Sequence, residues 1–237
     1  MTLTVAELSA KIDHTLLAPE ATAGRIDELC DQTVQYGFAA VCVNPVHVRR
    51  AAARIEEGTG SNREGRRPAV VSVAGFPLGA DTTAIKLEQA RQAVGDGATE
   101  IDMVVNLGAL IAGDRRLVRR EIEALAHVVH GQSAGGILKV ILETGVLTHE
   151  QIALGCRCCA EGEADFVKTS TGFHPSGGAT VEHVRMLHRL ASPIRVKASG
   201  GIRTLKTARE MLEAGAVRLG TSSGVAIVEE LRKAEAL

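Results

Sequence analysis

The stretch F-V-K-T-S-T-G, from Phe166 to Gly172, decides how the rest of the chain is interpreted. An apolar pair leads directly to Lys168, and a hydroxyl-rich turn then ends at a glycine. This pattern predicts a buried strand that ends in an amine. Apolar surroundings lower the pKa of a lysine, and a neutral amine can attack a carbonyl carbon to form a Schiff base. The simpler alternative is a lysine at a strand end whose ammonium group reaches solvent.

A second stretch has the same design. R-V-K-A-S-G-G-I, from Arg195 to Ile202, places Lys197 on an apolar run before a Gly-Gly turn. Outward from these two stretches, short apolar runs alternate with longer amphipathic ones. Eight strands are predicted, at Asp13, Cys42, Val71, Asp102, Val140, Val167, Val196 and Leu219. Helices are predicted at about 5–11, 22–36, 81–95, 114–130, 150–161, 180–190 and 204–214, with another opening at Pro45 and one following the last strand.

Strands that alternate with helices of this length indicate parallel pairing through right-handed crossovers. Eight such units in 237 residues predict an α/β fold: a single (β/α)8 TIM barrel domain over residues 1–237 with a short N-terminal helix. The polar, Gly-rich segment 58–67 is predicted to be a surface loop, because the alternation resumes directly after it. An open doubly wound sheet is the alternative, but no G-x-G-x-x-G follows the first strand.

Composition narrows the choice of partners. Aromatic residues make up 2% of the chain, which argues against a base-stacking surface for nucleic acid. The net charge of -1, with both signs interspersed, gives no electrostatic footprint for nucleic acid or an anionic membrane. No apolar run approaches the length of a membrane span, and the N-terminus lacks a signal-peptide pattern. We therefore expect a cytoplasmic protein that binds small molecules.

The five cysteines raise the question of a metal site, because three of them lie in C-R-C-C, from Cys156 to Cys159. No second C-x-x-C occurs, and a helix over this segment would send the three sulfurs to different sides. Reduced thiols are the default in a reducing compartment. We therefore predict no metal and no other cofactor.

Charged residues on the predicted strands point to a shared site. Even-numbered strands offer Cys42, Asp102 and Lys168, and odd-numbered strands offer Asp13, Lys139 and Lys197. Helices cover the outside of parallel strands, so these side chains are expected inside the barrel near its mouth. The alternative is a buried ion-pair network without chemistry.

Glycine-rich turns follow the last three strands. Gly172 follows the sixth strand, Gly200 and Gly201 follow the seventh, and G-T-S-S-G, from Gly220 to Gly224, follows the eighth. Barrels often bind phosphate here, where backbone N–H groups and a helix N-terminus meet the anion. Ordinary tight turns would explain any one of these glycines taken alone.

Seven segments together resemble the deoxyribose-phosphate aldolase family over nearly the whole chain: I-D-H-T-L-L, C-V-N-P, E-I-D-M-V-V-N, L-K-V-I-L-E-T, V-K-T-S-T-G-F, V-K-A-S-G-G-I-R and G-T-S-S-G. The resemblance implies a metal-independent class I aldolase that cleaves 2-deoxy-D-ribose 5-phosphate to D-glyceraldehyde 3-phosphate and acetaldehyde. It also implies that Lys168 forms the Schiff base, that Lys197 is its electrostatic neighbour, and that Asp102 belongs to the proton relay. Alternatives are a transaldolase-like or ketose aldolase, and a noncatalytic sugar-phosphate sensor.

The expected substrate contacts extend beyond this trio. Asp13 and Cys42 are predicted to line the substrate channel, and the full predicted set is Asp13, Cys42, Lys139, Thr169, Gly172, Gly200, Gly201, Gly220, Ser222 and Ser223. The expected partners are the sugar phosphate and aldehyde substrates and, for assembly, a second copy in a homodimer.

Two departures from the family pattern bear on the phosphate. Many members carry a lysine directly after S-T-G, where this chain has Phe173 and then His174. His174 or Arg203 would then supply the nearby cation. The chain also ends A-E-A-L, without the C-terminal tyrosine of some members, so a proton-shuttling role for such a tail is not carried over.

Overall fold

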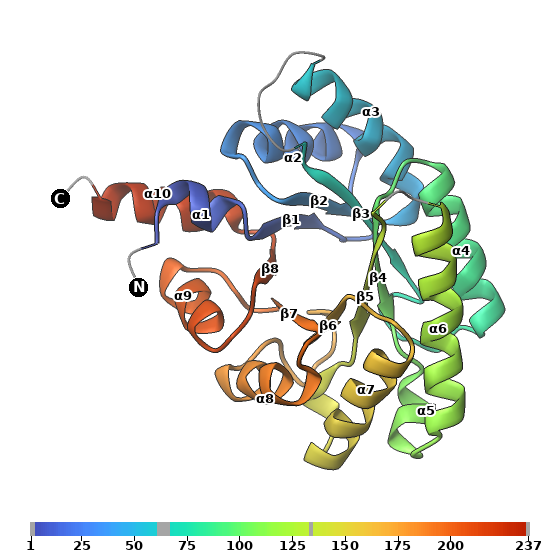
Figure 1. The fold of residues 1–237 in the computed structure, drawn as a ribbon. Coiled ribbons are helices and arrows are strands. Elements are labelled where there is room, and N and C mark those ends of the chain that lie inside the picture. Colours follow the sequence, from blue (N-terminus) through green and yellow to red (C-terminus); the bar gives the residue numbers. More distant parts are fainter. Residues whose placement is uncertain (1–2, 61–66, 133–134, 236–237) are drawn as a thin grey trace.

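Eight parallel strands close into a barrel in the computed structural model, which describes residues 3–60, 67–132 and 135–235 (Figure 1). The strands pair in chain order, and the last pairs with the first. Their bounds are β1 Ile12–Leu16, β2 Ala40–Val43, β3 Ala69–Ala74, β4 Glu100–Val104, β5 Ile137–Ile141, β6 Phe166–Lys168, β7 Arg195–Ser199 and β8 Arg218–Thr221. The predicted (β/α)8 barrel is confirmed, and the open sheet is wrong.

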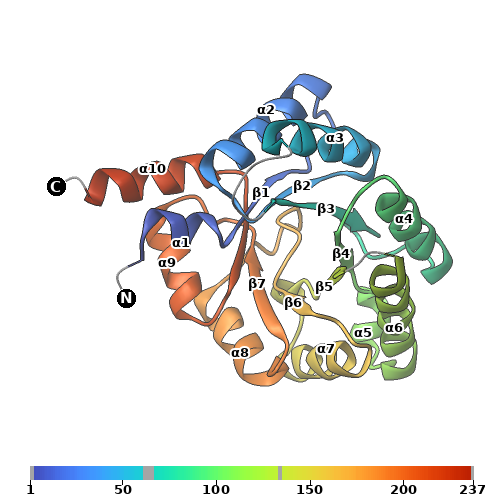
Figure 2. The same ribbon diagram turned by 45° about the horizontal axis from the view of Figure 1, so that its top comes forward.

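Helices surround the barrel, and α1 lies beside α10 (Figures 1 and 2). Their bounds are α1 Val5–Ser9, α2 Ala23–Tyr36, α3 Val48–Thr59, α4 Thr83–Gly95, α5 Leu107–Ile111, α6 Arg115–Gln132, α7 His149–Glu161, α8 Val181–Ala191, α9 Leu205–Glu213 and α10 Gly224–Glu235. Short 3-10 turns occupy η1 Pro45–His47 and η2 Thr144–Val146. Across the described ranges, no helix is long and apolar enough to cross a membrane.

Three local predictions need correction. Helix α5 was not predicted, although Asn106 begins it by accepting a hydrogen bond from the amide of Ala109. Pro45 opens a 3-10 turn and not α3 itself. Within the predicted loop 58–67, residues 58 and 59 still belong to α3, and residues 61–66 lie outside the described part of the chain.

Threonine caps explain where several helices begin. Thr82, at the start of α4, accepts a hydrogen bond from the amide of Ile85. Thr148 and Thr204 form capping boxes with the residues three positions later. Because each cap satisfies N–H groups that the helix leaves unpaired, it fixes the point at which the chain leaves the barrel mouth.

The barrel interior is divided into an apolar part and a charged part. One small buried cluster fills the side of β2 and β3, and it consists of Leu17, Ala40, Cys42, Val71 and Val73. A much larger apolar core lies between the strands and the helices. The inward positions of the other strands carry buried charged side chains. Those strands therefore contribute the chemistry of the interior.

A buried ion pair also lies outside the barrel, between α4 and α6. The Nζ atom of Lys86 is 2.9 Å from Oε1 of Glu121, and both side chains are fully buried. Lys86 also donates to the carbonyl of Val104 at 2.9 Å, and Glu121 accepts from the amide of Asn106 at 3.0 Å. These contacts tie two helices to the end of β4.

We expect Lys86→Met to lower the free energy of unfolding by about 3–5 kcal/mol, because it leaves the carboxylate of Glu121 buried without its cation. Urea unfolding at pH 7 measures the change. Adding Glu121→Gln to this variant should recover part of the loss, and Lys206→Met, at an exposed lysine, is the matched control. If Lys86→Met lowers the free energy of unfolding no more than Lys206→Met does, the Lys86–Glu121 pair does not stabilise the fold.

Candidate active site

Six charged side chains inside the barrel form a closed ring in which carboxylates and cations alternate. The order around the ring is Asp13, Arg218, Glu100, Lys139, Asp102 and Lys197, and Lys197 returns to Asp13. The nearest N–O distances, in that order, are 2.6, 3.0, 2.6, 2.8, 2.7 and 2.5 Å. All six residues are buried. When every group is ionised, the ring is neutral.

Lys168 adds a further cation to this neutral ring. Its Nζ atom donates to Oδ2 of Asp102 at 2.8 Å, and Asp102 already contacts Lys139 and Lys197. Four cations then face three carboxylates in the cluster. An unbalanced charge is costly in a buried site, so loss of a proton from Lys168 restores neutrality.

The pKa directions agree with this balance. Burial, assisted by the charge of Lys197, lowers the pKa of Lys168, although Asp102 acts in the opposite direction. Burial would also lower the pKa of Lys197, but Asp102 and Asp13 outweigh it and raise that pKa. Lys168 is therefore the lysine whose neutral amine is favoured, while Lys197 keeps its proton.

Asp102 and Asp13 stay ionised for the converse reason. Burial alone would raise the pKa of Asp102, but the neighbouring Lys139, Lys168 and Lys197 outweigh it and hold this pKa well below its ordinary value. Arg218 and Lys197 lower the pKa of Asp13 against burial in the same way. Asp102 is thus a fixed negative charge that holds Lys168 in place.

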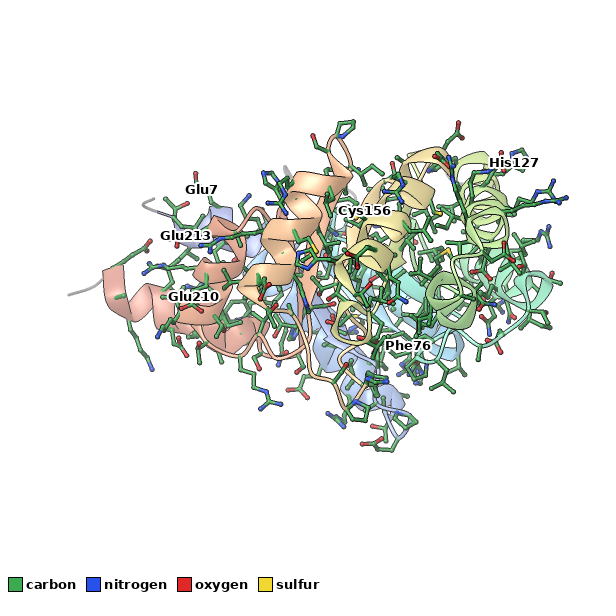
Figure 3. The ribbon with its side chains drawn as sticks, turned by 90° about the horizontal axis from the view of Figure 1, so that it is seen from below. Glu7, Phe76, His127, Cys156, Glu210 and Glu213 are labelled. Atoms are coloured by element: carbon green, nitrogen blue, oxygen red, sulfur yellow. The ribbon has the colours of Figure 1, made fainter. Side chains whose placement is uncertain are left out.

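Lys168 also borders a pocket of about 370 Å³ at the carboxyl ends of the strands. Its other lining residues are Thr15, Leu16, Leu17, Ala18, Arg25, Thr171, Gly172, Phe173, Ser199, Gly200, Gly201, Ile202, Arg203, Gly220, Thr221 and Ser222. Phe173 meets Phe76 edge to face, with ring centroids 5.2 Å apart. Figure 3 shows Phe76 towards one end of the barrel and Glu7 and His127 towards the other. The pocket thus opens at the predicted mouth.

The turn after β6 is held against two neighbouring loops. Glu143 has a left-handed φ of 55°, and its buried carboxylate accepts hydrogen bonds from the amide and the hydroxyl of Thr171. Gly172 and Gly200 also have positive φ values, and a Cβ on Gly200 would lie 3.1 Å from Cα of Gly172. Side chains at either glycine would separate the two turns, so their close approach requires glycine.

The structure divides the predicted site residues into two groups. Lys168 lines the pocket together with the turn residues Gly172, Gly200, Gly201, Gly220 and Ser222. Asp102 and Lys197 lie beneath it, in contact with each other and, through Asp102, with Lys168. Even-numbered and odd-numbered strands therefore contribute to one connected cluster.

The remaining predicted substrate contacts do not line this pocket, and the structure places them around it. Asp13 and Lys139 are members of the ring. Cys42 belongs to the apolar cluster, where burial raises the pKa of its thiol to about 11. The Thr169 hydroxyl instead exchanges hydrogen bonds with the backbone of Ser199. Ser223 donates its amide to Thr221 at the start of α10.

The two predicted cations differ in position. Arg203 lines the pocket, whereas His174 does not and its Nδ1 lies 2.8 Å from the Ser176 hydroxyl. Sequence reasoning missed Arg25, which lines the pocket from α2. It also missed Glu100 and Arg218, although Glu100 stands two positions before Asp102 on the same strand face and Arg218 interrupts a core strand.

The five cysteines were predicted to be reduced thiols that hold no metal. All five are free and buried, and α7 carries Cys156, Cys158 and Cys159 (Figure 3 labels Cys156). Within the described residues, no group of three His, Cys, Asp or Glu side chains is arranged to hold a metal ion.

Comparison with known proteins identifies the family. Residues 8–230 match the model of the DeoC/LacD family aldolases. The chain belongs to this aldolase family. A protein of Thermococcus gammatolerans named deoxyribose-phosphate aldolase is 50% identical over 230 residues, which are 97% of this chain and 98% of that protein.

Solved structures of this aldolase family agree with the barrel. The structure named "QR15, an Aldolase" has a TM-score of 0.86 and 40% sequence identity, and the match covers 97% of both chains. The tetrameric deoxyribose phosphate aldolase of Aeropyrum pernix also has a TM-score of 0.86, with 33% identity, covering 97% of this chain and 93% of that one.

We expect Asp13→Asn to lower the free energy of unfolding at pH 7 by about 3 kcal/mol or more, because Asp13 is a buried carboxylate paired with two cations. The pKa of Asp13 is lowered on folding, so its contribution is present above about pH 4 and is lost as the pH falls. The difference in free energy of unfolding between Asp13→Asn and the unmodified protein should therefore become smaller as the pH is lowered from 6 to 3.

Urea unfolding at a series of pH values measures this gap. Glu20→Gln, at an exposed carboxylate, controls for removing a negative charge. A gap that stays constant over the whole range would show that the ionisation of Asp13 does not stabilise the fold.

Proposed function

We propose that this aldolase reversibly cleaves 2-deoxy-D-ribose 5-phosphate to D-glyceraldehyde 3-phosphate and acetaldehyde, through a Schiff base on Lys168 and without a metal or other cofactor. The observation that carries the proposal is the surplus positive charge at Lys168, next to a pocket. The substrate comes from the relatives named deoxyribose-phosphate aldolase, such as the 50% identical protein of Thermococcus gammatolerans.

Lys168 begins the reaction as a neutral amine. It attacks C1 of the open-chain sugar, and the resulting carbinolamine loses water to give an iminium ion. The iminium accepts the electron pair of the C2–C3 bond as that bond breaks, while the C3 hydroxyl loses its proton and C3 becomes the aldehyde carbon of glyceraldehyde phosphate. The enamine that remains is protonated at carbon and hydrolysed by water, which releases acetaldehyde and regenerates Lys168.

Asp102 and Lys197 support this chemistry from beneath the pocket. Asp102 orients the amine through its 2.8 Å contact with Lys168. Because the pKa of Asp102 is held low, we assign the proton transfers to water acting with Asp102, and not to a stored proton on this carboxyl. Lys197 keeps its charge and so disfavours protonation of Lys168.

The phosphate would bind where the loops after β7 and β8 reach the pocket. Gly200, Gly201 and Gly220 bring backbone into the lining, and Ser222 brings a hydroxyl close to the N-terminus of α10. Such a site suits an anion, because N–H groups and the helix dipole both favour negative charge. Arg203 adds a cation.

Three further proposals concern domain organisation, assembly and location. Residues 1–237 are proposed to act as one barrel domain, and the protein is proposed to assemble as a homodimer, with a tetramer as the alternative because the Aeropyrum pernix relative is tetrameric. A cytoplasmic location is supported by five free, buried thiols, which suit a reducing compartment.

Borohydride reduction in the presence of acetaldehyde is expected to add an ethyl group to Lys168, because reduction converts the Schiff base to a stable secondary amine. Peptide mapping by mass spectrometry locates the adduct, and Lys168→Arg should form none. An adduct on Lys139 or Lys197 would reverse the roles of the lysines. Preferential trapping of dihydroxyacetone would favour a ketose aldolase, and the absence of any adduct would favour a noncatalytic sensor.

Lys197→Leu is expected to move the acid limb of the pH profile of kcat/KM to higher pH. Removing the neighbouring cation raises the pKa of Lys168, so a smaller fraction is neutral amine at a given pH. If the pKa of Lys168 rises by about one, activity at pH 7 should fall about tenfold. Lys206→Leu, at an exposed lysine, is the control, and an unchanged limb in Lys197→Leu would exclude this electrostatic role.

A further inference from the structure

Arg25 is an exposed arginine in the first turn of α2, and it lines the same pocket as Lys168. No carboxylate of the described residues lies within 4.0 Å of its guanidinium. Two other first-turn arginines, Arg49 and Arg50 of α3, are paired with Asp96 and Asp27. The charge of Arg25 is therefore available to a ligand.

The acidic side chains that follow Arg25 on α2 are engaged elsewhere. Asp27 pairs with Arg50 at 2.5 Å, and Asp31 pairs with Arg54 at 2.8 Å. Glu28 accepts a hydrogen bond from Gln32 at 3.1 Å. These contacts leave no carboxylate of the helix's first three turns committed to Arg25.

The position of Arg25 does not help the helix itself. A cation in the first turn opposes the helix dipole, which typically costs about 0.3–1 kcal/mol. The first turn of α2 contains no acidic residue, and Thr22 makes no capping hydrogen bond with its side chain. Local stability therefore gives no reason for an arginine here, whereas a negatively charged ligand in the pocket would.

The pocket lining supports such a ligand. Among the described residues, the lining contains the cationic side chains Arg25, Lys168 and Arg203 and no aspartate or glutamate. Arg25 follows β1 and Arg203 follows β7, so they flank the loop after β8, which lies between these strands in the barrel. That loop supplies Gly220 and Ser222. Phe173 also lines the pocket, where it provides an apolar ring and no charge.

We propose that the guanidinium of Arg25 binds the phosphate of the substrate from the α2 side and sets the preference for phosphorylated over free deoxyribose. This inference rests on the proposed function and names a specificity residue for it. Arg25 and Arg203 hold the phosphate between them, while Lys168 reaches the aldehyde end of the same molecule. Arg25 thus supplies the charge that Phe173 does not.

The test compares Arg25→Ala, Arg25→Lys and the control Arg209→Ala, which removes an exposed arginine from α9 that does not line the pocket. Arg25→Ala should raise KM for 2-deoxyribose 5-phosphate about tenfold, because the loss of one exposed hydrogen bond to a charged acceptor weakens binding by about that factor. It should leave kcat/KM for free 2-deoxyribose unchanged, because that sugar has no phosphate. Arg25→Lys should restore part of the affinity. Arg209→Ala should change neither sugar.

Two further measurements separate this role from a structural one. The thermal midpoint of Arg25→Ala should equal or exceed that of the unmodified protein, since the substitution relieves an unfavourable dipole contact. The difference in KM should shrink as salt is raised from about 50 to about 500 mM, because charge screening strengthens over that range.

Equal effects of Arg25→Ala on both sugars, or no effect on KM for the phosphorylated sugar, would overturn the proposal. The outcome is distinct from failure of the proposed function. If the unmodified protein cleaves neither sugar and forms no borohydride adduct, the aldolase activity itself is wrong. In that case inorganic phosphate decides the Arg25 proposal: it should raise the thermal midpoint of the unmodified protein more than that of Arg25→Ala, and equal shifts or no shift would overturn it.

Discussion

The unequal number of cations and carboxylates inside the barrel is the constraint on which the site depends. Asp13, Glu100 and Asp102 are matched by three cations around a closed ring, and Lys168 attaches to that ring only through Asp102. Removing one partner from a buried pair leaves an uncompensated charge, so the ring resists any change in its own ionisation. Lys168 can change its charge without leaving a ring member unpaired. The neutrality of the ring is therefore consistent with the lowered pKa of Lys168.

The parallel barrel makes this arrangement possible. Strand register places Asp102 beside Lys139 and Lys168 beside Lys197, so long side chains from neighbouring strands converge. The inward side chains of β2 and β3 are apolar, so the charged side chains are confined to the other strands. Helices cover the outside of the strands, and the charged side chains inside the barrel pair with one another. Because the charged side chains are confined to one part of the interior, they lie close enough to form a closed ring.

Much of this could be predicted from the sequence, because polar residues on otherwise apolar strands must face inwards in a barrel. That reasoning found Lys168, Lys197 and Asp102, and applied to the positions two residues away it would also have found Glu100. Depth along the barrel could not be predicted in this way. Period-two alternation separates inward from outward positions but does not tell a pocket residue from one beneath it. Cys42 and Lys139 were predicted as substrate contacts on this alternation, and neither lines the pocket. Arg25 escaped notice because it is an exposed residue of an amphipathic helix, a pattern that usually means solvent.

Burial alone does not decide the direction of a lysine's pKa shift, since Lys168 and Lys197 are both buried and yet have pKa values shifted in opposite directions. For this pair, the direction follows the number of carboxylate partners. Lys197 contacts both Asp13 and Asp102, whereas Lys168 contacts Asp102 alone. Lys139 also contacts two carboxylates, Glu100 and Asp102. Of these three lysines, Lys168 is also the one that lines the pocket. The lysine with the fewest carboxylate partners is thus the one that borders the pocket, which supports the Schiff-base role proposed for Lys168.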